Sequence, residues 1–200
     1  MGKILMLQFP IPHINLGGPY TNRTIAAMFK CDDVSVASRK QTIYEEGGTT
    51  RGFNIYVYDG RLYVGGWHGA ELNFEGAWLS TSITSHKWYH IALILRDGQD
   101  VFQPDKLGRW MNAKLIDRDS GGQLIRHGNL TGIGAVNGNT AFHDGIVEDT
   151  NVHHFKGVID DVRLYDAALN QDDIRNLAGP LAVEPNNRFT TTWAAIKARR

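Results

Sequence analysis

Two aromatic and β-branched runs on either side of Asp59-Gly60 are the feature that most constrains the fold. The first run is FNIYVY and the second is RLYVGGW. An Asp-Gly pair readily adopts the positive φ angles of a two-residue turn, so the two runs are predicted to pair as a β-hairpin. We therefore expect a β protein.

Further short runs of the same kind follow along the chain, each bounded by Gly, Asp, Asn or Ser. They are TIAAMFK from Thr24, QTIYEE from Gln41, WLSTSI near Trp78, KWYHIALIL from Lys87, RWMNAKLI from Arg109, GIGAV from Gly132 and FKGVIDDVRLYD from Phe155. Strands at such regular spacing predict a sandwich or a barrel. The 22 glycines and the 5 Trp, 7 Tyr and 8 Phe residues suit aromatic-rich strands joined by tight turns.

One short helix is expected after the last strand, in ALNQDDIRNLAG. Asn170 is a suitable N-cap, Asp172 and Asp173 stand in the first turn, and Gly179 follows the end. Beyond Gly179 the segment has two prolines, a polar middle and a basic end, which indicate an appendage to the domain.

The composition excludes several classes of protein. Lys plus Arg and Asp plus Glu both number 21, so no global field attracts the chain to nucleic acid or to an anionic membrane. Cys31 is the only cysteine, which excludes an intrachain disulfide and a cysteine-based zinc cluster. The apolar run from Ile4 to Leu7 is too short for a signal peptide, and no transmembrane stretch occurs.

The last strand and the helix resemble those of the laminin G-like and pentraxin-like jelly rolls. The shared pattern is F-x-G-x-I-D-[DE]-V-R-[IL]-Y followed by a polar A-L-x-x-x-[DE]-I. The matching residues are Phe155, Gly157, Ile159, Asp160, Asp161, Val162, Arg163, Leu164, Tyr165, Ala168, Leu169 and Ile174. RTIAAMFK and HKWYHIALILRDG are similar to two further strands of this family, and YEEGGTTRGFNIYVYDGRLYVGGW is similar to a variant found in large bacterial secreted and surface proteins.

The resemblance implies an all-β fold, a two-sheet antiparallel jelly-roll sandwich of the concanavalin A-like type with one short C-terminal helix. The domain is expected over residues 21–178, with an N-terminal arm over residues 1–20 and a C-terminal tail over residues 179–200. The segment from Gly98 to Gly108 is longer than the usual link of the family, so the pairing of the strands beside it is left open.

A non-catalytic role is expected. Sugar-cleaving relatives of the retaining kind carry E-x-D-x-x-E on one strand, which directs alternate carboxylates into one cleft, and this chain has no such string. Glu45 and Glu46 are adjacent, as are Asp160 and Asp161, so neither pair shares a face of a strand. A polysaccharide hydrolase or lyase is kept as the weakest alternative.

Sugar-binding surfaces combine aromatic faces with planar polar groups. Tyr56, Tyr58 and Trp78 are aromatic candidates, but half of a hairpin's aromatic residues face the core. Trp67 and His68, which stand among glycines, are the preferred ring-bearing candidates. With four polar residues they make up the predicted ligand-binding set: Trp67, His68, Arg51, Asn54, His143 and Asp144.

A structural Ca²⁺ ion is implied by the resemblance, because relatives of this domain often hold one. Its expected ligands are Asp160 and the backbone carbonyls around Asn15 and Gly17. The alternative is that Asp160 accepts hydrogen bonds from the backbone of the N-terminal arm. The segment NGNTAFHDGIVEDTNVHH gathers histidines and carboxylates, but an ordinary solvated loop is favoured there over a zinc site.

Two functions follow from these observations. The first is a lectin-like module that recognises a glycan or a protein at an extracellular or surface-exposed location. The second is a structural subunit of a larger assembly, such as a virion surface or decoration protein, which docks and oligomerises through residues 1–20 and 179–200. The expected partner is thus a glycan or a cell-surface or virion protein, and neither nucleic acid nor a membrane.

Overall fold

The computed structural model describes residues 7–8, 17–69, 74–127 and 131–179. Six strands form one sheet in the order β1 (Leu7–Gln8), β10 (Gly132–Ile133), β3 (Gln41–Gly47), β4 (Arg51–Tyr58), β5 (Arg61–His68) and β6 (Phe74–Ser82). Five strands form the other in the order β13 (Gly157–Tyr165), β2 (Arg23–Cys31), β7 (Trp88–Leu95), β8 (Gln103–Met111) and β9 (Lys114–Gly121). A separate hairpin consists of β11 (Val136–Phe142) and β12 (Gly145–Val152).

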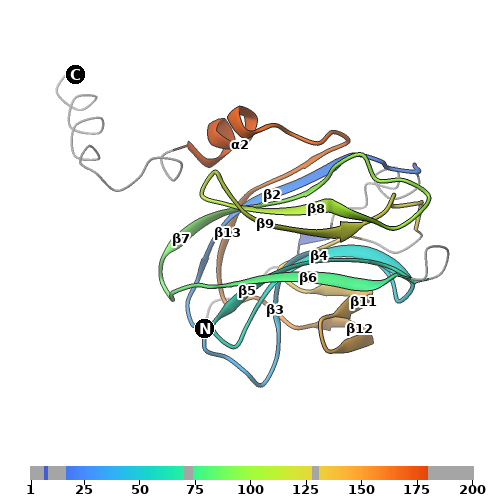
Figure 1. Cartoon of the computed structure of the whole chain (residues 1–200). Coiled ribbons are helices and arrows are strands. Elements are labelled where there is room, and N and C mark those ends of the chain that lie inside the picture. The colour runs from blue at the N-terminus through green and yellow to red at the C-terminus, as the bar shows by residue number, and fades with distance from the viewer. Residues whose placement is uncertain (1–6, 9–16, 70–73, 128–130, 180–200) are drawn as a thin grey trace, which may run out of the picture.

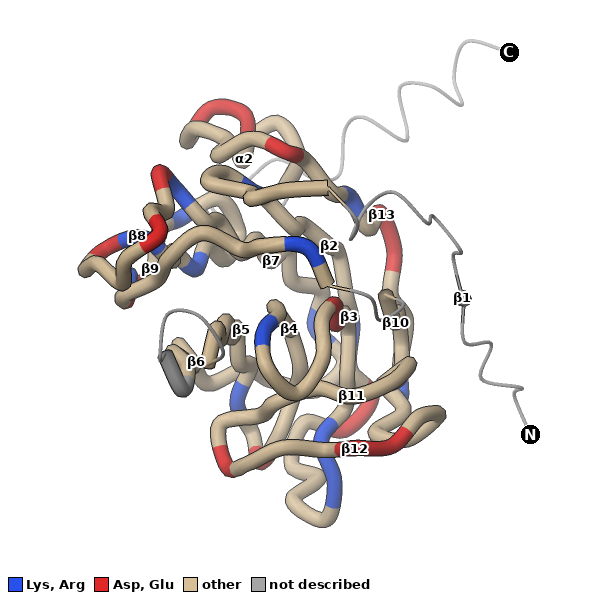
Figure 2. Tube along the Cα trace, turned by 90° about the vertical axis from the view of Figure 1, so that its right-hand side faces the viewer, with Lys and Arg blue, Asp and Glu red and all other residues tan. Residues whose placement is uncertain are grey.

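The two sheets pack face to face, and each has a further layer on its outer side (Figure 1). The helix α2 (Gln171–Ala178) covers the five-stranded sheet, where Ile174 and Ala178 pack with Ala92 and Ile94. The β11–β12 hairpin lies beneath β3 and β4 of the six-stranded sheet (Figure 2). The expected jelly-roll sandwich with one short C-terminal helix is therefore confirmed.

The hairpin predicted at Asp59-Gly60 is present as β4 and β5. Asp59 has φ of 45° and Gly60 has φ of 74°, the left-handed values that a two-residue turn of this kind needs. On β4, Phe53, Ile55 and Val57 are buried in the core between the sheets. The alternate side chains of β4 therefore point to the outer face of the six-stranded sheet.

Two expectations about strands were wrong. RWMNAKLI is not one strand but the end of β8 and the start of β9, joined by a turn in which Asn112 and Ala113 have φ of 48° and 63°. The segment expected as a solvated loop is the β11–β12 hairpin, whose turn is His143-Asp144.

The long link before β8 does not prevent pairing, since β7 and β8 pair from Ile91↔Met111 to Leu95↔Leu107. Helix α2 begins as predicted: the side-chain oxygen of Asn170 accepts hydrogen bonds from the backbone N–H groups of Asp172 and Asp173 at 2.8 and 3.0 Å. Asp173 accepts the Asn170 N–H in return at 3.0 Å, which completes a capping box.

Most of the two arms lies outside the described residues, so the division of the chain at residues 20 and 179 stays a prediction. Within the described part of the arm, Leu7 and Gln8 pair with β10. No helix in the described ranges combines the length and the apolar character that crossing a membrane requires.

Candidate ligand-binding surface

The outer face of β4, β5 and β6 carries a row of aromatic and small residues. Phe53, Val64 and Ala77 belong to the core, so strand alternation turns their neighbours outward. The outward residues are Asn54, Tyr56 and Tyr58 on β4, Tyr63, Gly65 and Trp67 on β5, and Gly76, Trp78 and Ser80 on β6. Of these aromatics, Tyr58, Tyr63 and Trp78 are partly exposed.

Trp78 lies flat against the sheet because two glycines leave room for its ring. A Cβ atom on Gly65 would stand 2.3 Å from the Cδ1 and Nε1 atoms of the indole. A Cβ atom on Gly76 would stand 2.1 Å from its Cη2 atom, at the opposite end of the ring. Both ends of the indole therefore rest on glycine backbone, which fixes the ring parallel to the surface.

Trp67 supports Trp78 from the side. Its ring lies over Gly52, where a Cβ atom would approach Cζ2 to 2.7 Å, and its Nε1 donates to the Gly48 carbonyl at 2.9 Å. The two indoles have centroids 6.4 Å apart and planes only 14° apart. Trp67 is 3% exposed, so it positions Trp78 and presents little surface of its own.

The β11–β12 hairpin packs against the outer face of the sheet next to these aromatic residues. Asn54 Nδ2 donates to the Ala141 carbonyl at 2.5 Å, and the Tyr56 hydroxyl lies 2.8 Å from His143 Nδ1. Phe142 packs edge-on against Tyr56, with centroids 4.7 Å apart. These contacts fix the tip of the hairpin against the outer face of the six-stranded sheet.

His143 and Asp144 stand at that tip. The exposed His143 ring stacks on Tyr63, with centroids 4.5 Å apart and planes at 16°. Partial burial lowers the pKa of His143. Asp144 forms an ion pair with Lys40 at 2.6 Å, and this contact outweighs burial and lowers the pKa of the carboxyl. We call Tyr63, Trp78 and His143 the aromatic surface.

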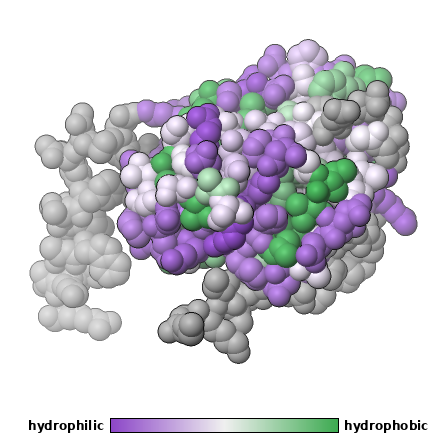
Figure 3. Space-filling view, turned by 90° about the horizontal axis from the view of Figure 1, so that it is seen from below, coloured by the Kyte–Doolittle hydropathy of each residue, from purple (hydrophilic) through white to green (hydrophobic). Residues whose placement is uncertain are grey.

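Figure 3 views the molecule from the side of the hairpin and shows hydrophilic residues around separate hydrophobic patches. Tyr63 and His143 each present a ring face together with a polar atom to a ligand. Ser80 and Arg61 add a hydroxyl and a guanidinium near Tyr63, since the Arg61 Nε donates to the Ser80 Oγ at 3.0 Å.

The structure places the six predicted ligand-binding residues in two groups. His143 and Asp144 form the tip of the hairpin, Asn54 contacts Ala141 close to that tip, and Trp67 lies beside Trp78. Arg51 and His68 pair across β4 and β5 at the far end of the sheet, where His68 is buried and its Nδ1 lies 2.9 Å from the Gln123 carbonyl.

Tyr63 was missed in the sequence. The signal for it was the alternation of RLYVGGW, in which Tyr63, Gly65 and Trp67 share one face of the strand. Whether the six predicted residues bind a ligand stays a prediction.

The predicted calcium site at Asp160 stays a prediction, because part of its expected ligand set falls outside the described residues. Asp160 lies at a bulge in β13, exposed, and its Oδ1 accepts the N–H of Asp161 at 2.8 Å. No group of three His, Cys, Asp or Glu residues with metal-binding geometry occurs in the described ranges. Gly17 is described and exposed, and Asn15 lies outside the described residues.

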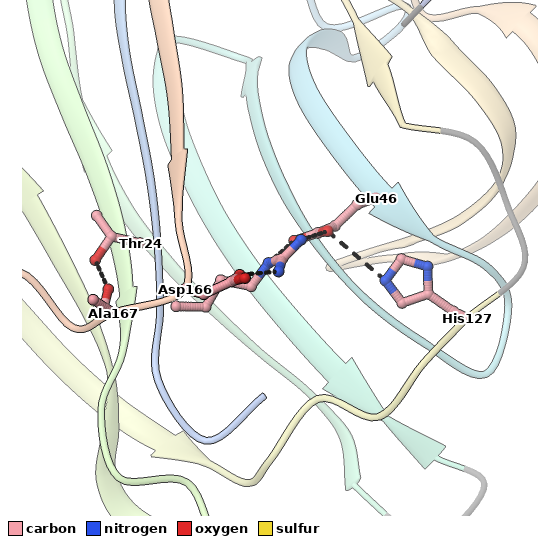
Figure 4. Close-up of polar contacts among 6 residues, drawn as sticks. Thr24, Glu46, His127, Asp166 and Ala167 are labelled. Carbon is pink, nitrogen blue, oxygen red and sulfur yellow. Dashed lines mark hydrogen bonds and ion pairs between the residues drawn. The ribbon is translucent and has the colours of Figure 1, made fainter. Parts of the chain in front are cut away.

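Glu45 and Glu46 point to opposite faces of β3, as expected. Glu46 faces the space between the sheets and accepts two bonds from Arg23, at 3.0 Å from Nε and 2.7 Å from Nη2. Arg23 also contacts Asp166 at 3.0 Å, and His127 Nε2 lies 3.8 Å from Glu46. Figure 4 shows this series of contacts from Asp166 to His127.

Glu45 faces outward beneath β11. Its Oε1 accepts the backbone N–H of Asn137 at 2.9 Å, whereas its Oε2 is buried and has no hydrogen-bond partner within the described chain. Burial raises the pKa of Glu45 to about 8, and the nearby charge of Glu46 adds to the rise. Glu45 is thus a buried neutral carboxyl at neutral pH, held away from Glu46.

Comparison with known proteins agrees with the fold described above. The family model for laminin G-type domains of the concanavalin A-like lectin/glucanases superfamily matches residues 8–175. A search of curated protein sequences finds no match.

Solved structures with the same fold include the receptor binding domain of botulinum neurotoxin D, at 12% identity and a TM-score of 0.58, covering 86% of this chain and 40% of that one. A heptameric SAP-like pentraxin from Limulus polyphemus matches at 16% identity and a TM-score of 0.52, over 80% of this chain and 70% of that one.

Domain 4 of the extracellular arabinanase AbnA from Geobacillus stearothermophilus, solved in complex with arabinotriose, matches at 15% identity and a TM-score of 0.52, over 80% of this chain and 67% of that one. The chain spans less than half of the toxin domains it matches. At these identities the likeness establishes the fold.

Proposed function

Because the chain belongs to the concanavalin A-like lectin/glucanases superfamily, as a laminin G-type domain, we propose that it is a non-catalytic module that binds a glycan. The binding site is the aromatic surface, at an extracellular or otherwise exposed location. The observation that carries the proposal is the Trp78 indole, held flat on Gly65 and Gly76 and partly exposed. A ring in this position offers one face to the apolar side of a sugar ring.

Polar groups at the edges of the aromatic surface support the same ligand class. The Asp144 carboxylate, the Ser80 hydroxyl and the Arg61 guanidinium lie around the rings and can hydrogen-bond sugar hydroxyls. His143 contributes both a ring face and a polar nitrogen. The AbnA domain, which has the same fold, was solved with an arabinose trisaccharide.

The buried carboxylates favour binding over glycoside hydrolysis. Cleavage needs two carboxyl groups that flank one bond, about 5 to 10 Å apart in a common cleft. Glu46 is held in an ion pair between the sheets, and Glu45 is enclosed beneath β11. Both are at most 1% exposed, so neither reaches a sugar at the surface.

The proposal is tested with an array of neutral and acidic oligosaccharides, probed with and without calcium, followed by titration calorimetry of any hit. We expect Trp78→Ala to weaken binding at least about tenfold, because it removes the stacking face. Trp88→Ala is the matched control, since Trp88 is a partly exposed tryptophan on β7 of the other sheet. An array without hits, or equal losses in the two variants, would contradict the proposal.

The assembly role through residues 1–20 and 179–200 stays a prediction, and so does the calcium site at Asp160. Deletion of residues 180–200 tests the former: an unchanged oligomeric state, with the sandwich still folded by circular dichroism, would refute docking through that tail.

A further inference from the structure

Arg61 lies beside the aromatic surface and is held there by a neutral residue. Its Nε donates to the Ser80 Oγ at 3.0 Å, and its Nη2 donates to the Ser80 backbone carbonyl at 3.2 Å. A guanidinium has five N–H donors, so these two bonds leave the other donors for a further group. The side chain is partly exposed, and it forms no ion pair within the described part of the chain.

The bonds to Ser80 place the guanidinium next to both stacking rings. Ser80 is the cross-strand partner of Tyr63 on the outer face of the sheet. On β6 it stands two residues from Trp78, on the same face, and two residues along a strand span about 7 Å. A sugar ring stacked on Trp78 therefore has the Arg61 guanidinium within reach of its substituents.

A second arginine makes this edge of the sandwich more positive. Arg109 on β8 is 1% exposed and bonds Asp117 of β9 at 2.7 Å, whereas its Nε and Nη1 have no hydrogen-bond partner among the described residues. Burial lowers the pKa of Arg109, the ion pair with Asp117 opposes this fall, and the charge of Arg61 adds to it. Since Asp117 is bonded to Arg109, it does not neutralise Arg61.

Two other carboxylates stand near the aromatic surface. Asp59, in the turn between β4 and β5, is exposed, so water and salt screen its charge, and it forms no bond with Arg61. Asp144 is bonded to Lys40 at 2.6 Å, so that pair is neutral overall. Within the described part of the chain, Arg61 is therefore a cation of this surface without an acidic partner.

We propose that the aromatic surface binds acidic glycans in preference to neutral ones, with the carboxylate or sulfate of a sugar stacked on Trp78 bound by the Arg61 guanidinium. The inference rests on the proposed function, because it names the class of sugar that the same surface binds. A guanidinium forms paired N–H bonds with either anionic group. Such charged bonds are stronger than neutral ones, so they distinguish sugars whose rings stack equally well.

The test is titration calorimetry of the full chain with two pairs of oligosaccharides. The first pair is trigalacturonate and its fully methyl-esterified form, and the second is sulfated and unsulfated galactotriose. At low ionic strength we expect the acidic member to bind at least about tenfold more tightly than its neutral counterpart. Added salt should reduce this difference. A preference in one pair alone would identify the anionic group as carboxylate or sulfate, and equal affinities within both pairs would overturn the proposal.

Arg61→Gln is the informative variant, since the glutamine amide can still donate to Ser80. We expect it to bind the acidic ligand about tenfold more weakly and the neutral ligand with a smaller loss, so that the preference disappears. Arg61→Lys keeps the charge but not the paired donors, and should retain part of the preference.

Arg175→Gln is the matched control for charge. Arg175 lies on α2, which covers the other sheet, and its side chain is 53% exposed. The variant removes the same unit of charge and should keep the full preference for the acidic ligand. An equal loss of preference in Arg175→Gln and Arg61→Gln would refute the role of Arg61, because it would show a response to net charge alone.

The two sugar proposals fail separately. If Trp78→Ala weakens the binding of both members of a pair while Arg61→Gln keeps the preference for charge, the Arg61 inference is refuted and the aromatic surface stands. If Arg61→Gln removes the preference while Trp78→Ala binds as the unaltered chain does, stacking on Trp78 is refuted and the charge contact stands. Absence of binding by all four oligosaccharides would overturn both.

Discussion

Glu45 allows a sharp prediction about how stability depends on pH. Its pKa in the folded chain is about 8, above the ordinary value of 4.5, because the carboxyl is buried beneath β11. Between these two pH values the folded chain holds a proton that the unfolded chain has released. The contribution of Glu45 to the free energy of unfolding is therefore complete below about pH 4.5, and falls as the pH rises toward 8.

The size of the change in the free energy of unfolding follows from the one extra proton that the folded chain holds. Each pH unit within that window lowers the free energy of unfolding by about 1.4 kcal/mol, so the loss between pH 5.5 and 7.5 is about 3 kcal/mol. Glu45→Gln removes the titration and keeps a carbonyl oxygen that can accept the N–H of Asn137. The other titrating groups are common to both chains, so the comparison isolates the titration of Glu45 together with its coupling to Glu46.

Urea unfolding at pH 5.5 and pH 7.5 measures the effect. We expect the unaltered chain to lose about 3 kcal/mol more than Glu45→Gln over this range. Glu148→Gln, which changes an exposed carboxylate on β12, should behave as the unaltered chain. Parallel pH profiles for the unaltered chain and Glu45→Gln would refute the reasoning, because they would mean that Glu45 is ionised throughout.

Three further substitutions test the energetics of the fold by the same unfolding assay. Arg23→Met leaves the Glu46 carboxylate buried without its bidentate partner and should lower the free energy of unfolding by about 3 to 5 kcal/mol. Arg163→Met breaks the exposed pair with Asp161 and should lower it by at most about 1 kcal/mol. Similar costs for both variants would contradict the burial argument. Asn170→Ala removes the N-cap of α2 and should cost about 1 kcal/mol, and a change near zero would show that helix packing alone fixes its start.

Local signals in the sequence predicted much of the sandwich. The Asp59-Gly60 turn and the Asn170 cap are set by residues next to one another, and both were found in place. KWYHIALIL, apolar at both alternate sets of positions, is the β7 strand: Ile91 and Leu93 face the core, and Ala92 and Ile94 pack under α2.

The β11–β12 hairpin was harder to predict because the residues that hold it in place are distant in the sequence. The Asp144-Gly145 step resembles the Asp59-Gly60 turn, but the strands beside it are polar, since β12 faces solvent over most of its length. Polar strands lack the hydrophobic alternation that identifies strands in a sequence. Asn54 and Glu45 hold β11 across about 90 residues of chain, and no local pattern reports such a contact.

The site prediction was limited by strand alternation at Arg51 and by sequence distance at Arg126 and His127. Arg51 was chosen with Asn54 as one site, yet they lie three residues apart on β4, which puts them on opposite faces of the strand. Arg126 and His127 were not considered as neighbours of Arg51, because no motif marks them. Only the folded chain brings them to the turn between β3 and β4.

The way in which the β11–β12 hairpin is attached has a consequence for how such a domain can diversify. Its two strands pair with each other and with no strand of the sandwich. Within the described residues, the side chains of Glu45, Asn54 and Tyr56 hydrogen-bond it to the neighbouring sheet. A hairpin of different length or tip sequence can therefore replace this one without disturbing the register of either sheet. Because the ring of His143 at its tip stacks on Tyr63, such an exchange would reshape the aromatic surface.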